Sequence, residues 1–322
     1  MIEFEIRGLV LLTVGLLGCG SPPEATDTAD GTGTEDEVST TDTTETTDTT
    51  ETTDTTETTD TTETTDTTET TDTTETTDTT DTTETTDTTG EMGCADVCGT
   101  PECGECPAFD MIAGEGYSID ATETPVVDYA LFVEVPFSEA LLHPDCGWKT
   151  DFIPDGWDEQ LLTPDNPVTD VDWCDAEAYC RWTGRHMCGA IGGGPTDFAD
   201  SSNPDAEWYA ACSAVDVQTF PYGDVYDPMA CNGMDFGAGA VVPVGSLATC
   251  EGSLVGLFDM SGNVREWVNS CDGDPNVDVS LQQCQRRGGS YASMTNSLDC
   301  PGSSDANRSS RTGTTGIRCC GD

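Results

Sequence analysis

The stretch that decides the fold reads Gly256-Leu257-Phe258-Asp259-Met260-Ser261-Gly262-Asn263-Val264-Arg265-Glu266-Trp267. A short apolar run leads into a Gly-Asn turn, and an acidic residue beside an aromatic one follows. Asp259, Gly262, Val264 and Glu266 recur at spacings of three, two and two. A curled loop could aim two carboxylates and two backbone carbonyls at one point, which suits a hard cation such as calcium. The alternative is a β-turn with solvated acids and a core Trp267.

Six further motifs accompany this loop in order along the chain. They read PVTDVDW (167–173), EWYAA (207–211), FPYG (220–223), PVGS (243–246), RGGSY (287–291) and GIR (316–318). In this order, from about Phe109 to Cys319, they resemble the sulfatase-modifying factor family, whose founding member is the formylglycine-generating enzyme. The resemblance implies an α+β fold over residues 109–322. The family's fold is an elaborated C-type-lectin-like one, and here we expect it to be irregular and disulfide-rich.

The resemblance also implies an activity, and the sequence departs from it. The formylglycine-generating enzyme oxidises a sulfatase Cys to formylglycine with oxygen and a copper ion held by two Cys. Carried over, those positions are Ser293 and Leu298. A hydroxyl and an alkyl chain cannot replace thiolates as copper(I) ligands. Ser290 matches the family's active-site Ser, but Arg265 stands where the family usually has a Trp beside the active site. We therefore expect copper chemistry to be lost and assign no catalytic residue.

The sequence offers little for other catalytic centres. A shifted site that uses Cys300, or an unexpected Cys pair, would preserve oxidase activity. Only two histidines are present, His143 and His186, which is too few for a three-His iron site. A Ser-His-Asp triad could use His186. Its segment follows a predicted helix, however, which is typical of a structural role. The sequence has no phosphate-binding loop and no dinucleotide fingerprint.

The calcium hypothesis is favoured by the resemblance. In the family loop the ligands correspond to the side chains of Asp259 and Glu266 and to the carbonyls of Gly262 and Val264, and all four positions are intact. A second family site uses an Asn after the FPWG motif. Asn232 matches that Asn, with Asp235 as an additional candidate ligand, although the intervening loop is shorter here.

The charge balance limits the kinds of partner that the protein can bind. The 322 residues include 62 acidic and 10 basic ones, and residues 94–322 keep 37 acidic against 9 basic residues, a balance of −28. Such a surface repels nucleic acid and anionic lipid head groups. Residues 94–322 suffice for one large domain with a real core, and all six Trp lie there.

The first 19 residues predict export. Residues 9–18 form an apolar run too short to span a bilayer, as in a signal peptide. The run ends in Leu16-Leu17-Gly18-Cys19, which resembles a bacterial lipobox with Cys19 as the lipidated residue. The alternative is an ordinary secretory signal cut nearby. We expect a lipid anchor in the bacterial cell envelope, facing the periplasm or the outer-membrane surface.

Residues 20–93 read as a tether. From Thr40 to Thr89 an acidic residue recurs between Thr pairs, with no apolar residue to bury. Such a segment cannot offset its ordering entropy, so we expect it to be disordered and extended.

The cysteines predict a disulfide framework. Of 17 Cys, Cys19 is assigned to the lipid, which leaves an even 16 and up to eight disulfides. Four of them, at 94, 98, 103 and 106, make residues 94–108 a Cys-rich cap, with a zinc knuckle as the alternative. Adjacent Cys319 and Cys320 are expected to bond different partners, because a bond between neighbours is strained.

Helix signals are local and strong in two places. Asp172 is placed as the N-cap of a helix whose face Cys174, Ala178 and Trp182 share, with Gly184 just past its end. Asn203 and Pro204 are expected to start another helix as N-cap and first residue. A further helix is expected from Asp128 to Val133.

These observations predict a lipoprotein whose domain has lost oxidase activity and binds a peptide, protein or glycan. Contact with a membrane would run through the lipid anchor alone. The rival hypotheses are an active formylglycine-generating oxidase and a purely structural coat protein.

Overall fold

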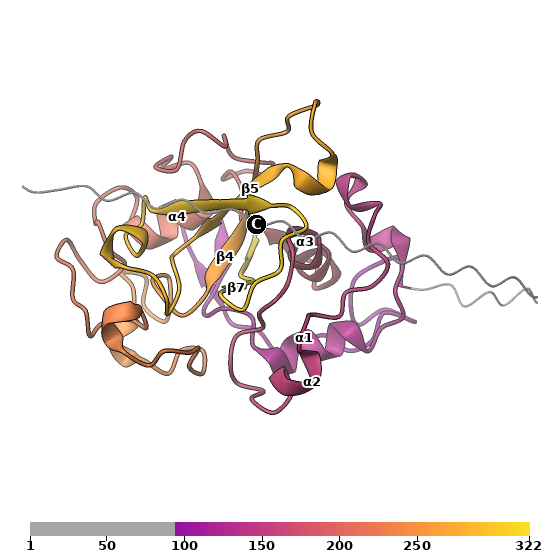
Figure 1. The fold of residues 1–322 in the computed structure, drawn as a ribbon, viewed down its shortest axis with the longest axis horizontal. Helices are drawn as coiled ribbons and strands as arrows, with labels where there is room; N and C mark the ends of the chain where they lie inside the picture. The colour runs from indigo at the N-terminus through magenta and orange to yellow at the C-terminus, as the bar shows by residue number, and fades with distance from the viewer. Residues whose placement is uncertain (1–93) are drawn as a thin grey trace, which may run out of the picture. The chain divides into compact units, whose positions relative to one another are not determined.

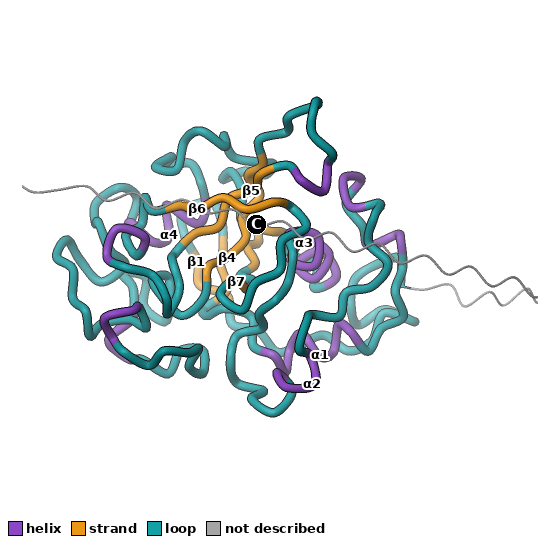
Figure 2. The backbone as a smooth tube through the Cα atoms, in the orientation of Figure 1, coloured by secondary structure: helices purple, strands orange, loops and turns teal. Residues whose placement is uncertain are grey.

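The computed structural model of the chain describes residues 94–322 (Figure 1). The predicted signal peptide with Cys19 and the predicted tether lie outside the described residues. Within the described range, no helix combines the length and apolar character needed to cross a bilayer. Loops carry most of the chain between short helices and strands (Figure 2). The expected irregular α+β class is confirmed.

One four-stranded antiparallel sheet joins the two ends of the described chain. Its order is β1 (Met111–Ala113), β2 (Ser118–Asp120), β8 (Cys319–Gly321) and β3 (His186–Met187). Cys320 lies opposite Ile119 on one side and opposite His186 on the other. Because successive side chains of a strand point to opposite faces, Cys319 and Cys320 meet different partners.

The second sheet carries the stretch that decides the fold. Its order is β6 (Ser303–Asn307), β5 (Gln283–Arg287), β4 (Arg265–Cys271) and β7 (Thr315–Gly316). The pairing of β4 with β5 is antiparallel, and its pairing with β7 is parallel. The Gly-Asn turn leads directly into Arg265, the first residue of β4, which is an inner strand of this sheet.

The helices are short. They are α1 (Val126–Val133), α2 (Trp157–Gln160), α3 (Trp173–Trp182) and α4 (Glu207–Ser213), with 3-10 turns between them. The predicted start of α3 is confirmed, because the Asp172 side chain accepts from the amides of Cys174 and Asp175 in a capping box. Gly184, with φ 75°, follows its end as predicted.

The predicted start of the next helix was wrong. The side chain of Asn203 accepts from the amide of Asp205, and its carbonyl accepts from Ala206, so this segment is a turn. Extended Ala206 pairs with Ala190 before α4 begins at Glu207. The bridge between these two alanines, a tertiary contact, overrides the local Asn-Pro signal. The first helix begins two residues earlier than expected, at Val126.

An aromatic cluster forms the core between α1 and α3. Tyr129, Phe132, Tyr179 and Trp182 are all buried, with ring centroids 5.3–6.0 Å apart. Aromatic pairs of this kind contribute about 0.5–1.5 kcal/mol each beyond their buried area. The indole of Trp182 also donates to the carbonyl of Cys103 at 2.7 Å. That bond ties residues 94–108 to the core.

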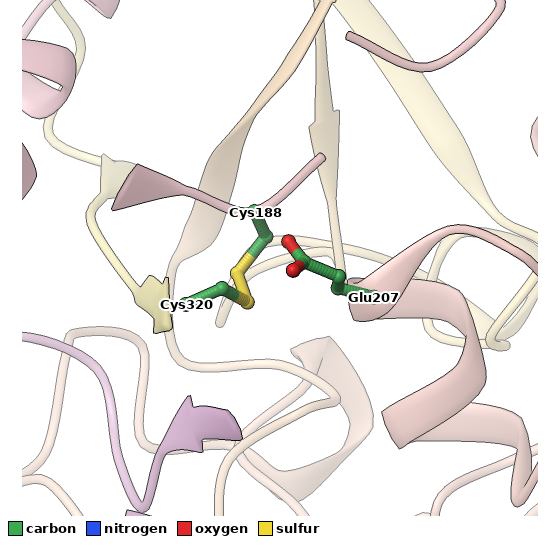
Figure 3. A group of neighbouring side chains, drawn as sticks. All are labelled: Cys188, Glu207 and Cys320. Carbon is green, nitrogen blue, oxygen red and sulfur yellow. A yellow bond between two sulfur atoms is a disulfide. The ribbon is translucent and has the colours of Figure 1, made fainter. Parts of the chain in front are cut away.

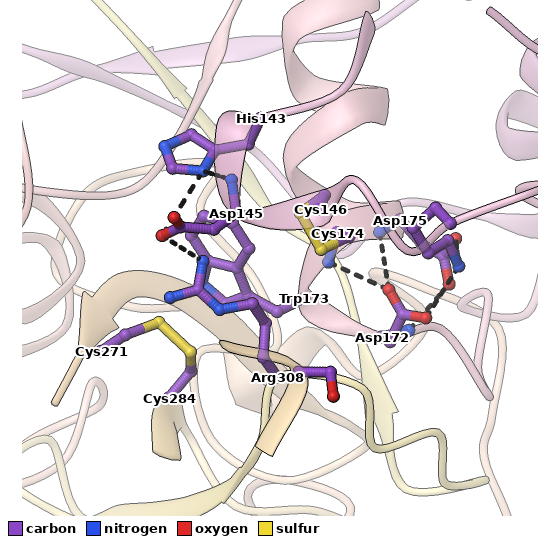
Figure 4. The surroundings of a disulfide bond; sticks show 12 residues. His143, Asp145, Cys146, Asp172, Trp173, Cys174, Asp175, Cys271, Cys284 and Arg308 are labelled. Carbon is purple, nitrogen blue, oxygen red and sulfur yellow. Dashed lines mark hydrogen bonds and ion pairs between the residues drawn. A yellow bond between two sulfur atoms is a disulfide. The ribbon is translucent and has the colours of Figure 1, made fainter. Parts of the chain in front are cut away.

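Eight disulfides join all sixteen cysteines of the described residues. The pairs are 94–103, 98–106, 146–174, 180–319, 188–320, 212–300, 231–250 and 271–284. The first two staple residues 94–108, as predicted in preference to a zinc knuckle. Figure 4 shows two of the bonds flanking Arg308, whose guanidinium lies 4.7 Å from the Trp173 ring centroid and pairs with Asp145.

Replacement of cysteine pairs should have a non-additive effect on stability. The 180–319 and 188–320 bonds tie the same two segments, over sequence separations of 139 and 132 residues. Replacing either pair with Ala leaves this long loop closed by the other bond, whereas replacing both opens it. We expect the free energy of unfolding, measured by urea denaturation, to fall by about 4–5 kcal/mol from loop entropy only when both are lost. Additive losses from the two single-pair variants would contradict this account.

Stability should also fall as pH rises. Burial raises the pKa of Glu177 to about 7, and one of its carboxylate oxygens is buried without a partner. A carboxyl whose pKa is higher in the folded state binds its proton more tightly there. That contribution is fully present below the unfolded pKa and is lost as pH rises through about 7.

Thermal unfolding between pH 5 and pH 8 tests this expectation. The slope of unfolding free energy against pH should become shallower in Glu177→Gln, by a total on the order of 1 kcal/mol across the range. The matched control is Glu159→Gln, at an exposed position. An unchanged slope in Glu177→Gln would show that Glu177 ionises alike in both states.

Candidate active site

Arg265 lies beside the two serines at which the resemblance places the family's active site. Its Nη1 donates to the hydroxyls of Ser290 at 3.1 Å and Thr314 at 3.2 Å, and its Nη2 donates to Ser293 at 3.0 Å. Ser290 and Ser293 are both buried. Burial lowers the pKa of the guanidinium, which still carries its charge at neutral pH. A fixed cation therefore bonds to both serines that sequence analysis singled out.

A tight turn holds the two serines together. The amide of Ser293 donates to the Ser290 carbonyl at 2.8 Å, and the amide of Ser290 donates to the Ser293 hydroxyl at 3.0 Å. The turn follows Gly289, whose φ is 72°. A Cβ there would lie 2.4 Å from the carbonyl oxygen of Ser297. Only glycine allows that approach, which explains the paired glycines of the motif.

Leu298, the other family copper position, is packed into apolar space. It is buried, and its side chain lies against Gly289 and Gly233, at 2.8 and 2.5 Å from where their Cβ atoms would stand. Cys300 does not provide a shifted thiol, because it is bonded to Cys212. The residues at these positions therefore do not fit a copper ion, since no thiolate is offered.

Glu266 is held by a buried arginine. Its Oε1 accepts from Nε of Arg318 at 2.9 Å, and its Oε2 accepts from the indole of Trp208. The same guanidinium donates to the carbonyls of Asp120 at 2.6 Å and Phe258 at 2.8 Å. Arg318 is fully buried. The sequence had marked this residue only as part of a motif, and its ion pair was missed.

Two further carboxylates surround that pair. Asp259 accepts from the amide of Gly245 at 2.6 Å, and Glu123 accepts from the amide of Val264 at 2.9 Å. Burial, reinforced by the charges of Asp259 and Glu266, raises the pKa of Glu123 well above its usual range. Burial also raises the pKa of Asp259 and of Glu266, and Arg318 opposes both shifts. Glu123 was not predicted, because nothing local in its segment signals burial.

Some oxygens of the predicted calcium loop accept no hydrogen bond. The carbonyl oxygens of Gly262 and Val264 and the Oδ1 atom of Asp259 accept none of the hydrogen bonds found in the described part of the chain. These oxygens suit a calcium ion. Glu266, the fourth predicted ligand, already accepts one hydrogen bond on each of its oxygens.

Asn232, the second calcium position, is buried at 2 % exposure. Its amide nitrogen donates to Ala240 and Asn263, each at 3.0 Å, and its Oδ1 has no partner among the described residues. Asp235 instead accepts from the Tyr226 hydroxyl at 3.1 Å. Asn232 therefore offers one buried acceptor that has no partner among the described residues.

His186 forms a separate polar group with Glu207. Its Nε2 lies 2.9 Å from Oε1 of Glu207, a buried carboxylate that also accepts from the amide of Gly189. Figure 3 shows this carboxylate beside the sulfurs of Cys188 and Cys320. Those sulfurs are bonded to each other and offer no thiolate. Among the described contacts, no hydroxyl reaches His186, so the residues show no catalytic triad.

Comparison with known proteins agrees with the motif order. The profile of the sulfatase-modifying factor enzyme 1-like domain matches residues 67–322. The formylglycine-generating enzyme of Thermomonospora curvata is 31% identical over 163 residues, which are 46% of each chain. The inactive C-alpha-formylglycine-generating enzyme 2 of Bos taurus is 30% identical over 32% of this chain and 33% of its own.

A further relative carries another name. The serine/threonine-protein kinase pkn1 of Chlamydia caviae is 28% identical over 48% of this chain and 24% of its own. This chain thus spans less than half the length of these curated relatives. The family profile, by contrast, covers most of the chain and ends at its last residue. By motif order and family profile, the chain belongs to the sulfatase-modifying factor family, whose members include both active and inactive formylglycine-generating enzymes.

Proposed function

We propose that this domain is a catalytically degenerate formylglycine-generating-enzyme-like module that binds a ligand rather than oxidising a cysteine. One observation carries the proposal: the Arg265 guanidinium bonds to Ser290 and Ser293 at the family's catalytic positions. The ligand expected from sequence is a peptide, protein or glycan. An active oxidase is the alternative.

Electrostatics supports the loss of copper chemistry. At an effective dielectric constant of about 20, two unit charges about 4 Å apart interact by about 4 kcal/mol. A copper(I) ion beside Ser293 would meet this repulsion from Arg265 without any thiolate to offset it. The eight disulfides leave no free thiol among the sixteen cysteines of the described residues.

The setting of the module is part of the proposal. Eight disulfides are typical of a protein that folds in an oxidising compartment. The lipobox-like Leu16-Leu17-Gly18-Cys19 favours a lipid anchor, and the Thr-acid repeat favours a long spacer. Together these features support a bacterial cell-envelope protein that holds its domain clear of the membrane.

Calcium at the loop is proposed as a stabilising ion. The ion would be held by the carbonyls of Gly262 and Val264 and by the Asp259 carboxylate, while Arg318 keeps Glu266. The support is the set of unengaged oxygens in a loop that already gathers three carboxylates. An ion there would add positive charge where one arginine faces three acids.

An oxidase assay tests the loss of catalysis. The full chain, incubated with copper(I), oxygen and a sulfatase-motif Cys peptide, should yield no aldehyde by mass spectrometry. The double variant Ser293→Cys, Leu298→Cys should bind copper(I) weakly, because Arg265 still faces the thiolates. Adding Arg265→Trp should raise copper(I) affinity by about tenfold or more, since that charge is removed.

Aldehyde formation by the unaltered chain would overturn the proposal, whichever residue carries the chemistry. Equal copper(I) affinity in the double and triple variants would show that Arg265 is not the barrier. Thiol titration of the unreduced chain supplies the matched control, because the rival oxidase needs two free thiols.

A chelation experiment tests the calcium proposal. An ion that binds only the folded state stabilises it by about 2.7 kcal/mol at a concentration 100 times its Kd. Chelator should therefore lower the melting temperature, and Asp259→Asn should abolish that sensitivity. Asp158→Asn, at an exposed acid of α2, is the control and should retain it. A melting temperature that does not change with chelator would contradict the calcium proposal. Arg318 would then be the counter-ion of the loop.

A further inference from the structure

A second arginine lies beside Arg265 on the same sheet. Arg286 on β5 is directly opposite Trp267 on β4, two residues along from Arg265. Because side chains alternate along a strand, Arg265, Trp267 and Arg286 share one face of the sheet. Both arginines are half-buried. The sheet therefore places two guanidinium groups together at the edge of the candidate site.

Neither guanidinium has a carboxylate partner. Among residues 94–322, no Asp or Glu oxygen lies within 4.0 Å of either one, whereas Arg185, Arg308, Arg311 and Arg318 all form such ion pairs. Acids outnumber bases 37 to 9 over these residues, so carboxylates are plentiful. Asp305 is the acid whose charge reaches Arg286, and that acid is exposed on β6.

Unused hydrogen-bond donors remain on both groups. A guanidinium has five N–H donors. Arg265 uses three of them, all on hydroxyls. Arg286 uses two, on Thr315 and on the carbonyl of Asp305, and its Nε is buried without a partner. Beside it in the register, Ser304 has a buried hydroxyl that also lacks a partner. These buried polar atoms therefore have unsatisfied hydrogen-bonding capacity within the described part of the chain.

The two charges also disfavour each other. Burial, and next the charge of Arg265, lower the pKa of Arg286 to about 10. Like charges without a counter-ion are costly in a half-buried site. A ligand with two negative charges would relieve that cost and engage the remaining donors.

We propose that Arg265 and Arg286 form a binding site for an oxyanion with two negative charges, such as a phosphate or sulfate group. Two guanidinium groups balance the charge of such an ion, and their N–H donors suit its several acceptor oxygens. This inference rests on the proposed function, because it assigns a ligand class to the site that has lost copper. The hydroxyls of Ser290, Ser293 and Thr314 hold Arg265 in place for it.

Isothermal titration of the full chain with inorganic sulfate, and separately with inorganic phosphate, tests the site. We expect saturable binding, at least about tenfold weaker in Arg265→Gln and in Arg286→Gln, because each variant loses charge-assisted bonds. Arg286→Lys keeps the charge and should lose less. The matched control is Arg181→Gln, at an exposed arginine of α3, and it should bind as the unaltered chain does. Acetate, with one charge, should bind about tenfold more weakly than sulfate.

Several outcomes would overturn the site. They are the absence of saturable sulfate and phosphate binding, binding that Arg286→Gln leaves unchanged, and an equal loss in Arg181→Gln. Should Arg265→Gln unfold, Arg286→Gln decides alone, because Arg286 bonds to neither of the two serines. The oxidase assay on the same preparation separates the two proposals. Aldehyde formation defeats the proposed function, while absence of both aldehyde and anion binding defeats this inference only.

Discussion

One buried cation, Arg318, organises the loop around which the domain is built. Its guanidinium binds Glu266 on β4 and the carbonyls of Asp120 on β2 and Phe258 at the start of the loop. An isolated buried charge costs several kcal/mol, so this arginine persists only because its partners meet it from both sheets. The surplus of negative charge falls on Glu123, because burial and the charges of Asp259 and Glu266 raise its pKa well above the usual range.

Local signals could be predicted from the sequence, and tertiary ones could not. The capping box of Asp172 and the buried face of α3 follow from short-range chemistry, and the even number of cysteines predicted a disulfide framework. The structure confirms these predictions. Asn203 carries the same kind of signal, but the bridge between Ala190 and Ala206 overrules it. The family's motif order predicted the fold because the motifs meet in space. The partner of Glu123 is 140 residues away, and no pattern in its own segment indicates that contact.

The altered copper positions have acquired contacts of their own. Leu298 fills space against Gly233 and Gly289, so the lost thiolate leaves no gap in the packing. Three N–H groups of Arg265 donate to hydroxyl groups, so these donors are satisfied inside the protein. The sequence showed that the thiolates were missing, but only the structure showed what the arginine bonds to. These contacts support the proposal that the site binds a ligand, because its apolar space is filled and three hydroxyls hold Arg265.

The distribution of the nine cations argues in the same direction. Five of them, including Lys149 between Asp172 and Asp175, neutralise carboxylates inside a domain with a balance of −28. Their positions follow from the need to keep buried acids paired. Arg286 lies over the Trp267 ring, 5.5 Å from its centroid, but neither it nor Arg265 has a carboxylate counter-ion among the described residues, and their mutual repulsion works against stability. The pairing is understandable if a ligand brings the missing negative charge, and the acidic surroundings then favour a ligand that both guanidinium groups can hold at once.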